Sequence, residues 1–454
     1  MLKTAMLRSS RYKPNPPQVM ALGFIALIFI GSILLYLPAA HEEGINDSYI
    51  NALFMAASAV CVTGLTLYNV GEQYSLFGEL VIISLVQIGG LGFMTMATLI
   101  ALAFRRRISY RERLILQEAM NQTTPEGIVR LIRRVLLYAF VIELIGAALL
   151  TARWLTEMPF RQAAYFGVFH SISIFNNAGF ELFGGLGDRP GSLMHYVEDP
   201  YINIVTIIMI ILGGIGFIVI ADLLSLPKNR KLSLHSKVVL SFSGGLIGVG
   251  ALVIFLFEYT NGLTLQPLSI GGKTFSAVFQ SVSARSAGLN TVDTAAFRQA
   301  TQFFIVLLMF IGAAPGSSGG GIKVTTFAIL IGAMLAMVRG KEDIVLFRCR
   351  IAKDRIHKAI TFTFLSFFFV VLAAMILSLT EPFPFLAILF EATSAYATAG
   401  MSVGVTPYLT DFGKIMLMLL MFIGRVGPIT LAFTLQPRPE KELYRYPEGK
   451  ITIG

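Results

Sequence analysis

The chain has 454 residues, of which 55% are hydrophobic and only 14% are charged. A soluble domain carries about 25% charged residues, so this composition excludes a soluble globular protein and indicates an integral membrane protein. The formal net charge is +10, and most basic residues lie in five segments, 3–13, 105–134, 228–237, 339–358 and 438–450. The positive-inside rule places these segments in the cytoplasm, so the charge reports topology and does not indicate a nucleic-acid partner.

Two apolar spans are expected between consecutive basic segments, each near or above the ~20 residues that cross a bilayer core. In chain order the spans cover residues 18–38, 76–104, 132–155, 200–224, 236–258, 301–338, 359–380 and 410–436. Because each pair leaves the cytoplasm and returns, both termini are expected on the cytoplasmic side of the cell membrane. The two cysteines, Cys61 and Cys349, then fall on opposite sides of the membrane, which implies neither a disulfide nor a metal site.

A shorter, semi-polar stretch lies between the two spans of each pair. The four stretches read FMAASAVCVTGLT from Phe54, FHSISIFNNAGFE from Phe169, FQSVSARSAGLN from Phe279 and FEATSAYATAGMS from Phe390. Each begins with Phe, carries Ser about a turn later and ends in a small residue, Gly and an apolar residue; the third stretch is one residue shorter. The glycines are separated by 115, 109 and 112 residues, which predicts an internal repeat: Gly64, Gly179, Gly288 and Gly400.

The second span of each pair carries another shared motif, IGGLGF at 88–93, LGGIGF at 212–217, IGAAPG at 311–316 and IGRVGP at 423–428. An alternative reading is that glycine merely permits close packing of membrane helices. The fourfold order instead predicts an all-α polytopic membrane protein of four parallel helix–pore-loop–helix repeats, with eight transmembrane helices in a pseudo-fourfold arrangement around one central pore. The predicted repeats are residues 1–110, 111–230, 231–345 and 346–454.

The Thr-Gly stretches predict an ion filter. Non-helical backbone at membrane depth is tolerated only where protein or a water-filled cavity satisfies its polar groups. We expect a short helix whose C-terminal dipole favours a cation, followed by a return through Gly that turns carbonyls inward. Carbonyl rings without a ring of acids suit K⁺ and not Ca²⁺. The predicted K⁺-binding residues, with K⁺ the only metal expected, are Val62, Thr63, Gly64, Asn177, Ala178, Gly179, Ser286, Ala287, Gly288, Thr398, Ala399 and Gly400.

The third pair departs from the others because its second span, 301–338, is unusually long and contains GAAPGSSGGG at 312–321. Pro and Gly disfavour a continuous helix, so the surplus length is expected to fold as an intramembrane gating loop below the filter. The alternative is a packing kink. The candidate gate residues are Gly312, Pro315, Gly316, Ser317, Ser318, Gly319, Gly320, Gly321, Lys323 and Arg425.

Arg425 occupies the motif position held by Gly90, Gly214 and Ala313 in the other spans. A buried arginine in a membrane is costly and usually functional, so we expect Arg425 to raise the barrier to K⁺ or to hold the loop; a structural donor to helix ends is the alternative. Lys323 is also open to a second reading, in which its side chain snorkels. Two further residues carry expectations. Arg285 is expected to brace its loop against an external acid, and Glu391 to lie at the N-terminus of the fourth short helix.

Five motifs, CVTGL, NNAGF, SARSAGLNTVD, ATAGMS and PGSSGGGIKVTT, together resemble the membrane subunit of Ktr-type potassium uptake systems, in the Trk/Ktr/HKT superfamily. The resemblance spans about residues 17 to 436. It implies K⁺ uptake, often stimulated by Na⁺, by a lipid-embedded homodimer with one pore per subunit and no covalent cofactor. It also implies a cytosolic RCK-type ring that binds nucleotide on the partner, not on this chain, and gates the pore.

The sequence disfavours three rival functions. An alternating-access cation transporter is disfavoured by the parallel pore loops, and the membrane subunit of a K⁺-pumping ATPase by the length of the chain. A membrane-embedded enzyme is disfavoured because no pair of His or carboxylates has metal or acid–base spacing within the spans. The candidate docking segments for a partner are the basic loops 105–113 and 339–358 and the tail after Arg438.

Overall fold

The chain was analysed as a computed structural model, which describes residues 16–45, 47–92, 114, 116, 128–185 and 191–427. Within these ranges the regular structure is helical except for a hairpin of β1 (Val345–Leu346) and β2 (Cys349–Arg350). The predicted docking segment 105–113 and the tail after residue 438 lie outside the described residues.

Among the described residues, four single helices are long and apolar enough to cross a membrane: α1 (Pro16–Tyr36), α7 (Ile128–Trp154), α11 (Leu234–Glu258) and α15 (Lys353–Thr380). Each is followed by a short, largely buried helix: α2 (Tyr49–Cys61), α8 (Phe160–Phe175), α12 (Ile270–Ser283) and α16 (Phe385–Ala397). The long helices expose large apolar side chains that suit contact with lipid, such as Phe29, Leu144, Leu252 and Phe364.

A third helix completes each group: α4 (Leu76–Leu91), α9 (Pro200–Gly214), α13 (Gln299–Phe310) and α17 (Asp411–Val426). Three of them begin at a side-chain N-cap, where Ser75 accepts from Gly78, Asp199 from Tyr201 and Ile202, and Thr410 from Gly413. The remaining helices are α3 (Val70–Gln73), α10 (Phe217–Asn229) and α14 (Val324–Val338), with 3₁₀ turns η1 (Pro38–Ala40), η2 (Phe183–Gly185), η3 (Met194–Tyr196) and η4 (Thr406–Tyr408).

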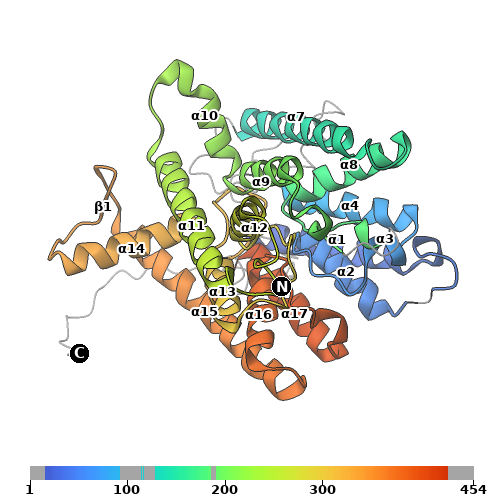
Figure 1. Cartoon of the computed structure of the whole chain (residues 1–454). Helices are drawn as coiled ribbons and strands as arrows, with labels where there is room; N and C mark the ends of the chain where they lie inside the picture. The colour runs from blue at the N-terminus through green and yellow to red at the C-terminus, as the bar shows by residue number, and fades with distance from the viewer. Residues whose placement is uncertain are drawn as a thin grey trace, which may run out of the picture.

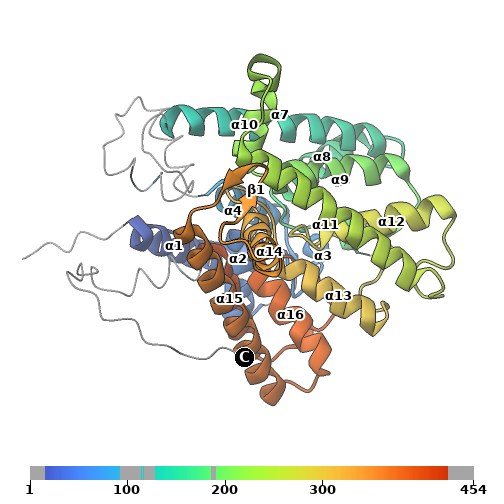
Figure 2. The same cartoon turned by 90° about the vertical axis from the view of Figure 1, so that its left-hand side faces the viewer.

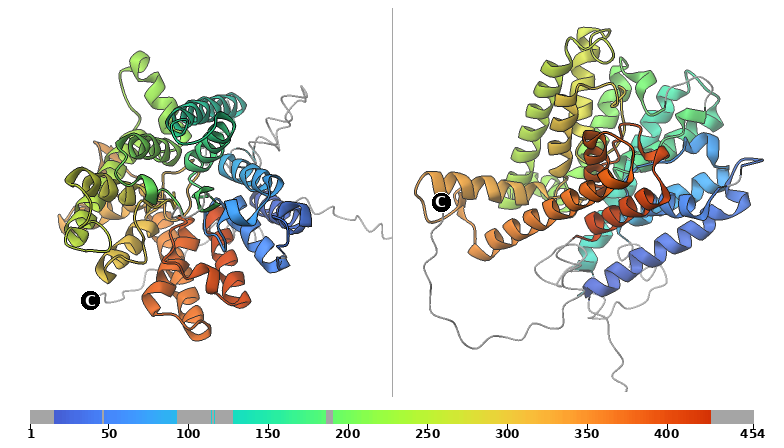
Figure 3. Two further views of the ribbon diagram at one scale, coloured as in Figure 1. Left: turned by 45° about the vertical axis from the view of Figure 1, so that its right-hand side comes forward. Right: turned by 90° about the horizontal axis from the view of Figure 1, so that it is seen from below.

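The helices gather in four groups around a common centre, which we call groups 1 to 4 in chain order (Figure 1 and Figure 3, left). Within each group the long helix packs against the short one. Between groups, the third helix packs against the next short helix: α4 on α8, α9 on α12, α13 on α16, and α17 on α2. The last contact joins group 4 to group 1 and closes the ring.

The expected single span over 200–224 is wrong. It consists of α9 and α10, which meet at a bend of 101°, and Figures 1 and 2 show α10 projecting from the bundle. The physical reason is Gly216, whose φ of +85° is incompatible with a right-handed helix. Helices α4 and α17 stop at the equivalent glycines, Gly92 and Gly427, which also have positive φ. Beyond them, residues 93–104 and 428–436 lie outside the described residues.

Candidate ion filter and gate

The four glycine-bearing stretches meet where the short helices end. A side chain added at Gly64 would overlap the carbonyl oxygen of Ala178, and one at Gly179 would come within 2.7 Å of the Ala287 oxygen. The series continues from Gly288 to the Ala399 oxygen, at 3.0 Å, and returns from Gly400 to the oxygen of Thr63. Each glycine thus abuts the carbonyl that precedes the next glycine, and the structure brings all four predicted filter stretches together in one closed ring.

The residue two positions before each glycine has left-handed backbone, which the sequence analysis missed. The four residues are Val62 (φ 58°), Asn177 (φ 57°), Ser286 (φ 99°) and Thr398 (φ 47°). This conformation costs non-glycine residues about 1–3 kcal/mol and persists only where the surroundings enforce it. Left-handed backbone at the same place in four stretches is consistent with the repeat and makes the ring the candidate functional site.

Hydrogen bonds at the end of each short helix enforce this geometry. In the first copy the Val62 amide donates to the Ala59 oxygen at 3.1 Å and the Thr63 amide to the Ser58 oxygen at 2.8 Å. This pair of bonds is the Schellman C-cap, in which glycine usually takes the left-handed position. Equivalent bonds recur in the second and fourth copies, from Ala178 to Ser173 and from Ala399 to Ser394.

The recurring serine holds the end of the short helix in two ways: its backbone oxygen accepts the cap bond, and in two copies its hydroxyl donates to the returning chain. In the third copy the Ala287 amide reaches the Ser283 oxygen at 2.9 Å, so this cap is one residue tighter, which accounts for the shorter stretch. Serine hydroxyls also bond the returning chain: Ser173 donates to the Phe180 oxygen at 2.7 Å and Ser283 to the Leu289 oxygen at 2.5 Å.

A polar side chain in two of the short helices holds the chain as it leaves the ring. His170 Nε2 accepts from the Leu182 amide at 3.3 Å, and Glu391 accepts from the Val403 amide at 3.1 Å and from the Thr406 hydroxyl at 2.6 Å. Glu391 lies in the middle of α16, so its expected place at the helix N-terminus is wrong. The sequence does contain a signal for this shared role: His170 and Glu391 each stand nine positions before the glycine of their stretch.

The recurring glycine motif of the third helices serves close packing. A side chain at Gly89, Gly213 or Gly424 would overlap a carbonyl near the end of its own short helix, at Val60, Phe175 or Tyr396 respectively. Each carbonyl precedes the filter glycine by four residues. In the third group the equivalent Gly312 faces the Gly320 oxygen instead, so the predicted gate loop takes the place of the helix end. The packing reading thus describes what these glycines do.

The predicted gate loop, residues 312–321, joins α13 to α14 and lies against the ring. Its neck is closed by bonds from Ile322 N to Phe310 O at 3.3 Å and from Val324 N to Ala313 O at 3.2 Å. Its tip reaches two left-handed filter residues. The Gly320 amide donates to Thr398 Oγ1 at 2.9 Å, and a side chain at Gly319 would come within 2.6 Å of Ser286 Oγ.

The same loop also contacts group 2. The Ala314 amide donates to the Gly214 oxygen at 3.0 Å, and the Ser318 hydroxyl donates to the Gly213 oxygen at 3.3 Å. The oxygen of Gly316 accepts from the Phe217 amide at 3.1 Å, next to the bend between α9 and α10. The loop is therefore tied directly to three of the four groups.

Arg425 supplies the link to the remaining group. Its guanidinium donates to the carbonyl oxygens of Ser318 in the loop and of Gly89 and Gly90 in α4. These α4 carbonyls belong to a helix C-terminus, which carries partial negative charge and suits a cation. Lys323 donates to the Gly319 oxygen and so also holds the loop. The two roles that the sequence left open for Arg425, loop contact and helix-end donor, are both present.

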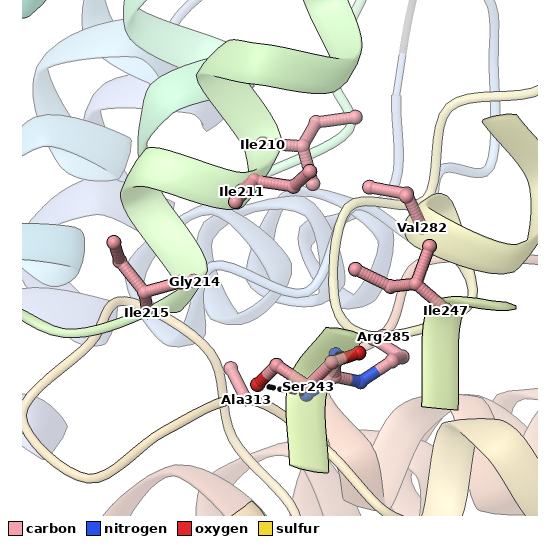
Figure 4. A pocket seen from close by; sticks show the side chains of 9 residues that line it. All are labelled: Ile210, Ile211, Gly214, Ile215, Ser243, Ile247, Val282, Arg285 and Ala313. Carbon is pink, nitrogen blue, oxygen red and sulfur yellow. Dashed lines mark hydrogen bonds between the residues drawn. The ribbon is translucent and has the colours of Figure 1, made fainter. Parts of the chain in front are cut away.

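The expectation for Arg285 is wrong. Its side chain contacts no acid in the described chain; it points to the N-terminal half of α11, where it bonds Ser243, and to Gly312 at the start of the loop. Figure 4 shows Arg285 and Ser243 beside a cavity between α9, α11 and α12. Isoleucines dominate its lining, and Ala313 of the loop completes it.

A buried acid behind the second filter stretch is a residue that the sequence analysis missed. Glu143, in the middle of α7, accepts from Gln87 Nε2 at 3.0 Å and from Asn176 Nδ2 at 3.1 Å. Asn176 also donates to Gln87 Oε1 at 2.7 Å. An acid within an apolar span is itself a signal of function, so Glu143 could have been selected from the sequence as a candidate functional residue.

The exposed residue Glu198 lies at the N-terminus of α12. It accepts from the Ser269 amide at 2.8 Å, and these bonds with Ser269 lower the pKa of the carboxyl group. A negative charge at this helix N-terminus favours the helix orientation that points its C-terminus at the ring. The described residues hold no cluster of three or more metal-ligating side chains.

Comparison with known proteins places this arrangement among cation transporters. Residues 7–444 match the family TrkH, described as cation transport protein. The Ktr system potassium uptake protein B of Bacillus subtilis is 42% identical over 97% of this chain and 97% of its own. The potassium/sodium uptake protein NtpJ of Enterococcus hirae is 38% identical over 99% and 100%. The Ktr system potassium uptake protein B of Vibrio alginolyticus is 36% identical over 98% and 97%.

A solved structure has the same fold. The crystal structure of the potassium transporter TrkH from Vibrio parahaemolyticus matches with a TM-score of 0.74, covering 95% of this chain and 86% of that one, at 18% sequence identity.

Proposed function

The chain belongs to the TrkH family of cation transport proteins, and from this premise we propose that it takes up potassium through the ring formed by its four glycine-bearing stretches. It is a multi-pass membrane transporter and not an enzyme, and the resemblance to the Trk/Ktr superfamily read from its motifs is confirmed. Its similarity to proteins named for potassium uptake supports the choice of ion.

The observation that carries the proposal is the closed series of contacts from Gly64 through Gly179 and Gly288 to Gly400 and back. Because no side chain fits at these positions, the lining consists of backbone. Carbonyl oxygens in that arrangement can replace the hydration shell of a K⁺ ion. Four helix C-termini directed at one centre add partial negative charge, which favours a monovalent cation and is too weak to bind a divalent cation tightly.

The proposed architecture is four parallel repeats, residues 1–110, 111–230, 231–345 and 346–454, with eight crossings and both termini in the cytoplasm. The recurrence of the long, short and third helix in each group supports it, as does the left-handed residue two places before each filter glycine. Basic residues at the α10–α11 junction and around the β1–β2 hairpin support the assignment of those ends to the cytoplasm.

The proposed gate is the loop of residues 312–321, held closed by Lys323 and Arg425. Its contacts with Ser286 and Thr398 support this role because they put the loop directly against the ring. Opening is assigned to a cytosolic RCK-type ring that binds nucleotide, and the functional unit to a homodimer. The name of the Bacillus subtilis relative, a protein of a Ktr system, supports a further component. Exposed residues of segment 339–358 are candidates for its docking.

Sodium is a second proposed cation. The Enterococcus hirae relative is named a potassium/sodium uptake protein. Each filter stretch of this chain contains a single glycine, which suggests a short filter that discriminates less strictly against Na⁺. We therefore include stimulation by Na⁺, or its partial passage, in the proposed activity.

The test is uptake of ⁸⁶Rb⁺ into proteoliposomes without ATP, with and without competing Na⁺. A side chain at Gly288 would come within 2.9 Å of Gly400 Cα, so Gly288→Ser is expected to reduce discrimination between K⁺ and Na⁺. Deletion of Ser317–Gly320 removes the loop tip and is expected to raise flux.

Intact selectivity in Gly288→Ser would overturn the filter, and unchanged flux in the deletion would overturn the gate. Uptake that requires ATP would favour the subunit of a K⁺-pumping ATPase. Saturable uptake that the deletion does not raise would favour alternating access.

A further inference from the structure

We propose that Arg285 is a positioning residue that couples the third filter stretch to the gate loop, so that displacement of the loop loosens the filter. The proposal rests on the filter and gate proposed above. It assigns to Arg285 a role that neither its position in the sequence nor the similarity of the chain to other proteins specifies.

The side chain of Arg285 bridges three elements. Its exposed fraction is 8%, and its NH1 and NH2 nitrogens donate to the backbone oxygen and hydroxyl of Ser243 on α11, at 3.3 and 3.2 Å. NH2 also donates to the oxygen of Gly312, the first residue of the gate loop, at 3.4 Å. Its own backbone lies between the end of α12 and the left-handed residue Ser286. One guanidinium thus joins a membrane helix, the filter and the loop.

The charge on Arg285 is held by neutral oxygen atoms. None of its hydrogen-bond partners in the described chain is an acid, and its Nε–H has no partner there. A buried cation without a counter-charge depends on each dipole that remains in contact with it. Gly312 lies just beyond the C-terminus of α13, whose carbonyls carry partial negative charge. Movement of Gly312 would remove one of three acceptors, so the position of Arg285 is sensitive to the position of the loop.

The neighbouring residue contacts the other end of the loop. Ser286 faces Gly319, where an added side chain would come within 2.6 Å of Ser286 Oγ and 2.7 Å of Ala313 Cβ. Gly312 and Gly320 lie back to back, so the start and the tip of the loop are in contact. Two consecutive residues of the third stretch, Arg285 and Ser286, therefore touch the two ends of one compact loop. The loop cannot leave the ring without breaking the Arg285 bond to Gly312 or moving Ser286.

The cavity of Figure 4 adjoins this contact. It lies beside Arg285 and Ala313, and its other walls include Ile211, Ile247 and Val282. Arg425 holds the loop tip from group 4, whereas Arg285 holds its first residue from group 3.

The experiment compares Arg285→Met in the full chain and in the chain that lacks Ser317–Gly320, with ⁸⁶Rb⁺ flux and the K⁺/Na⁺ flux ratio as readouts. In the full chain we expect flux to rise and the ratio to fall, each by about tenfold, because a hydrogen bond to a charged group is lost at both elements. In the loop-deleted chain we expect no further rise in flux, since the contact with the loop no longer restrains it. A merely structural role would lower the amount of folded protein and leave both readouts per folded molecule unchanged.

Two additional variants complete the series. Arg285→Lys carries a compact charge that reaches either Ser243 or Gly312 but not both, so an intermediate effect is expected. Arg298→Met removes an arginine of the same group that bonds Thr260 on the outer side, and should leave both readouts unchanged.

An equal rise in flux in the full and the loop-deleted chain, or no change in either, would overturn the coupling. The gate proposal is tested separately, by the flux of the loop-deleted chain that keeps Arg285. If Arg285→Met does not reach the membrane, Ser243→Ala tests the same contact by removing the hydroxyl acceptor and keeping the charge. A smaller rise in flux would then support the coupling, and unchanged flux would overturn it.

Discussion

The hydroxyl oxygen of Thr398 accepts a hydrogen bond from the amide nitrogen of Gly320 at 2.9 Å, which joins the fourth filter stretch directly to the gate loop. Thr398 is fully buried and its backbone is left-handed, with φ of 47°. The left-handed backbone of Thr398 and the position of the loop are thus linked at one hydrogen bond.

Replacing Thr398 separates the hydroxyl from the shape of the side chain. Thr398→Val keeps a β-branched side chain but leaves the Gly320 amide without its acceptor, which costs about 1–3 kcal/mol. We expect the closed loop to lose that stability and ⁸⁶Rb⁺ flux to rise by about five- to a hundredfold. Thr398→Ser retains the acceptor and should behave like the parent protein. A rise of equal size in both variants would show that the hydroxyl does not hold the loop.

Two glycines of the fourth group form a matched pair for testing the filter. Gly400 (φ 80°) abuts the Thr63 oxygen, whereas Gly404 (φ 83°) has no atom within 4 Å of an added Cβ. Gly404→Ala should therefore cost only the backbone strain of about 1–2 kcal/mol and leave uptake unchanged. Gly400→Ala should in addition distort the ring and abolish K⁺ selectivity. Competition of ⁸⁶Rb⁺ uptake by Na⁺ measures the difference, and equal selectivity in the two variants would contradict the filter.

Arg425 is expected to depend on guanidinium geometry and not on charge alone. Its guanidinium donates hydrogen bonds to the oxygen of Ser318 in the loop and to the oxygens of Gly89 and Gly90 in α4. A lysine ammonium is a compact charge that cannot reproduce this fork. We expect Arg425→Lys to raise basal flux and Arg425→Ala to raise it further, with Arg298→Lys as the control. Wild-type flux in Arg425→Lys would show that only the charge matters.

Glu143 tests the polar cluster behind the second filter stretch. Its two oxygens accept from different amides, Gln87 and Asn176, so Glu143→Gln places a donor nitrogen where one of these oxygens accepts and removes one buried hydrogen bond. The expected loss is about 1–3 kcal/mol of stability, seen as a lower melting temperature in detergent. Glu43→Gln, at an exposed position, provides the control. An unchanged melting temperature in Glu143→Gln would mean that the cluster contributes little to folding.

Much of the site could be predicted because its determinants are local. The period that links Gly64 to Gly400 is written in the chain, and Pro315 with its neighbouring glycines breaks a helix whatever surrounds it. Arg425 could be selected because a single charge stands where three related positions are small. Local rules could not decide which residue of each helix cap adopts the left-handed conformation, because more than one position can do so. The left-handed residue of each cap proved to be Val62 or its equivalent, since the glycine is needed two positions later, against the neighbouring carbonyl.

The sequence by itself therefore determined the membrane class, the four glycine-bearing stretches and the break at residues 312–321, because hydropathy, steric limits on φ and repeat spacing act over a few residues. Only the tertiary structure decided what the long polar side chains contact. Arg285 bonds Gly312, 27 positions away, and Arg425 bonds Gly89, 336 positions away. Such partners depend on how the four groups close around their centre. A long side chain has several acceptors within reach, and packing alone chooses among them.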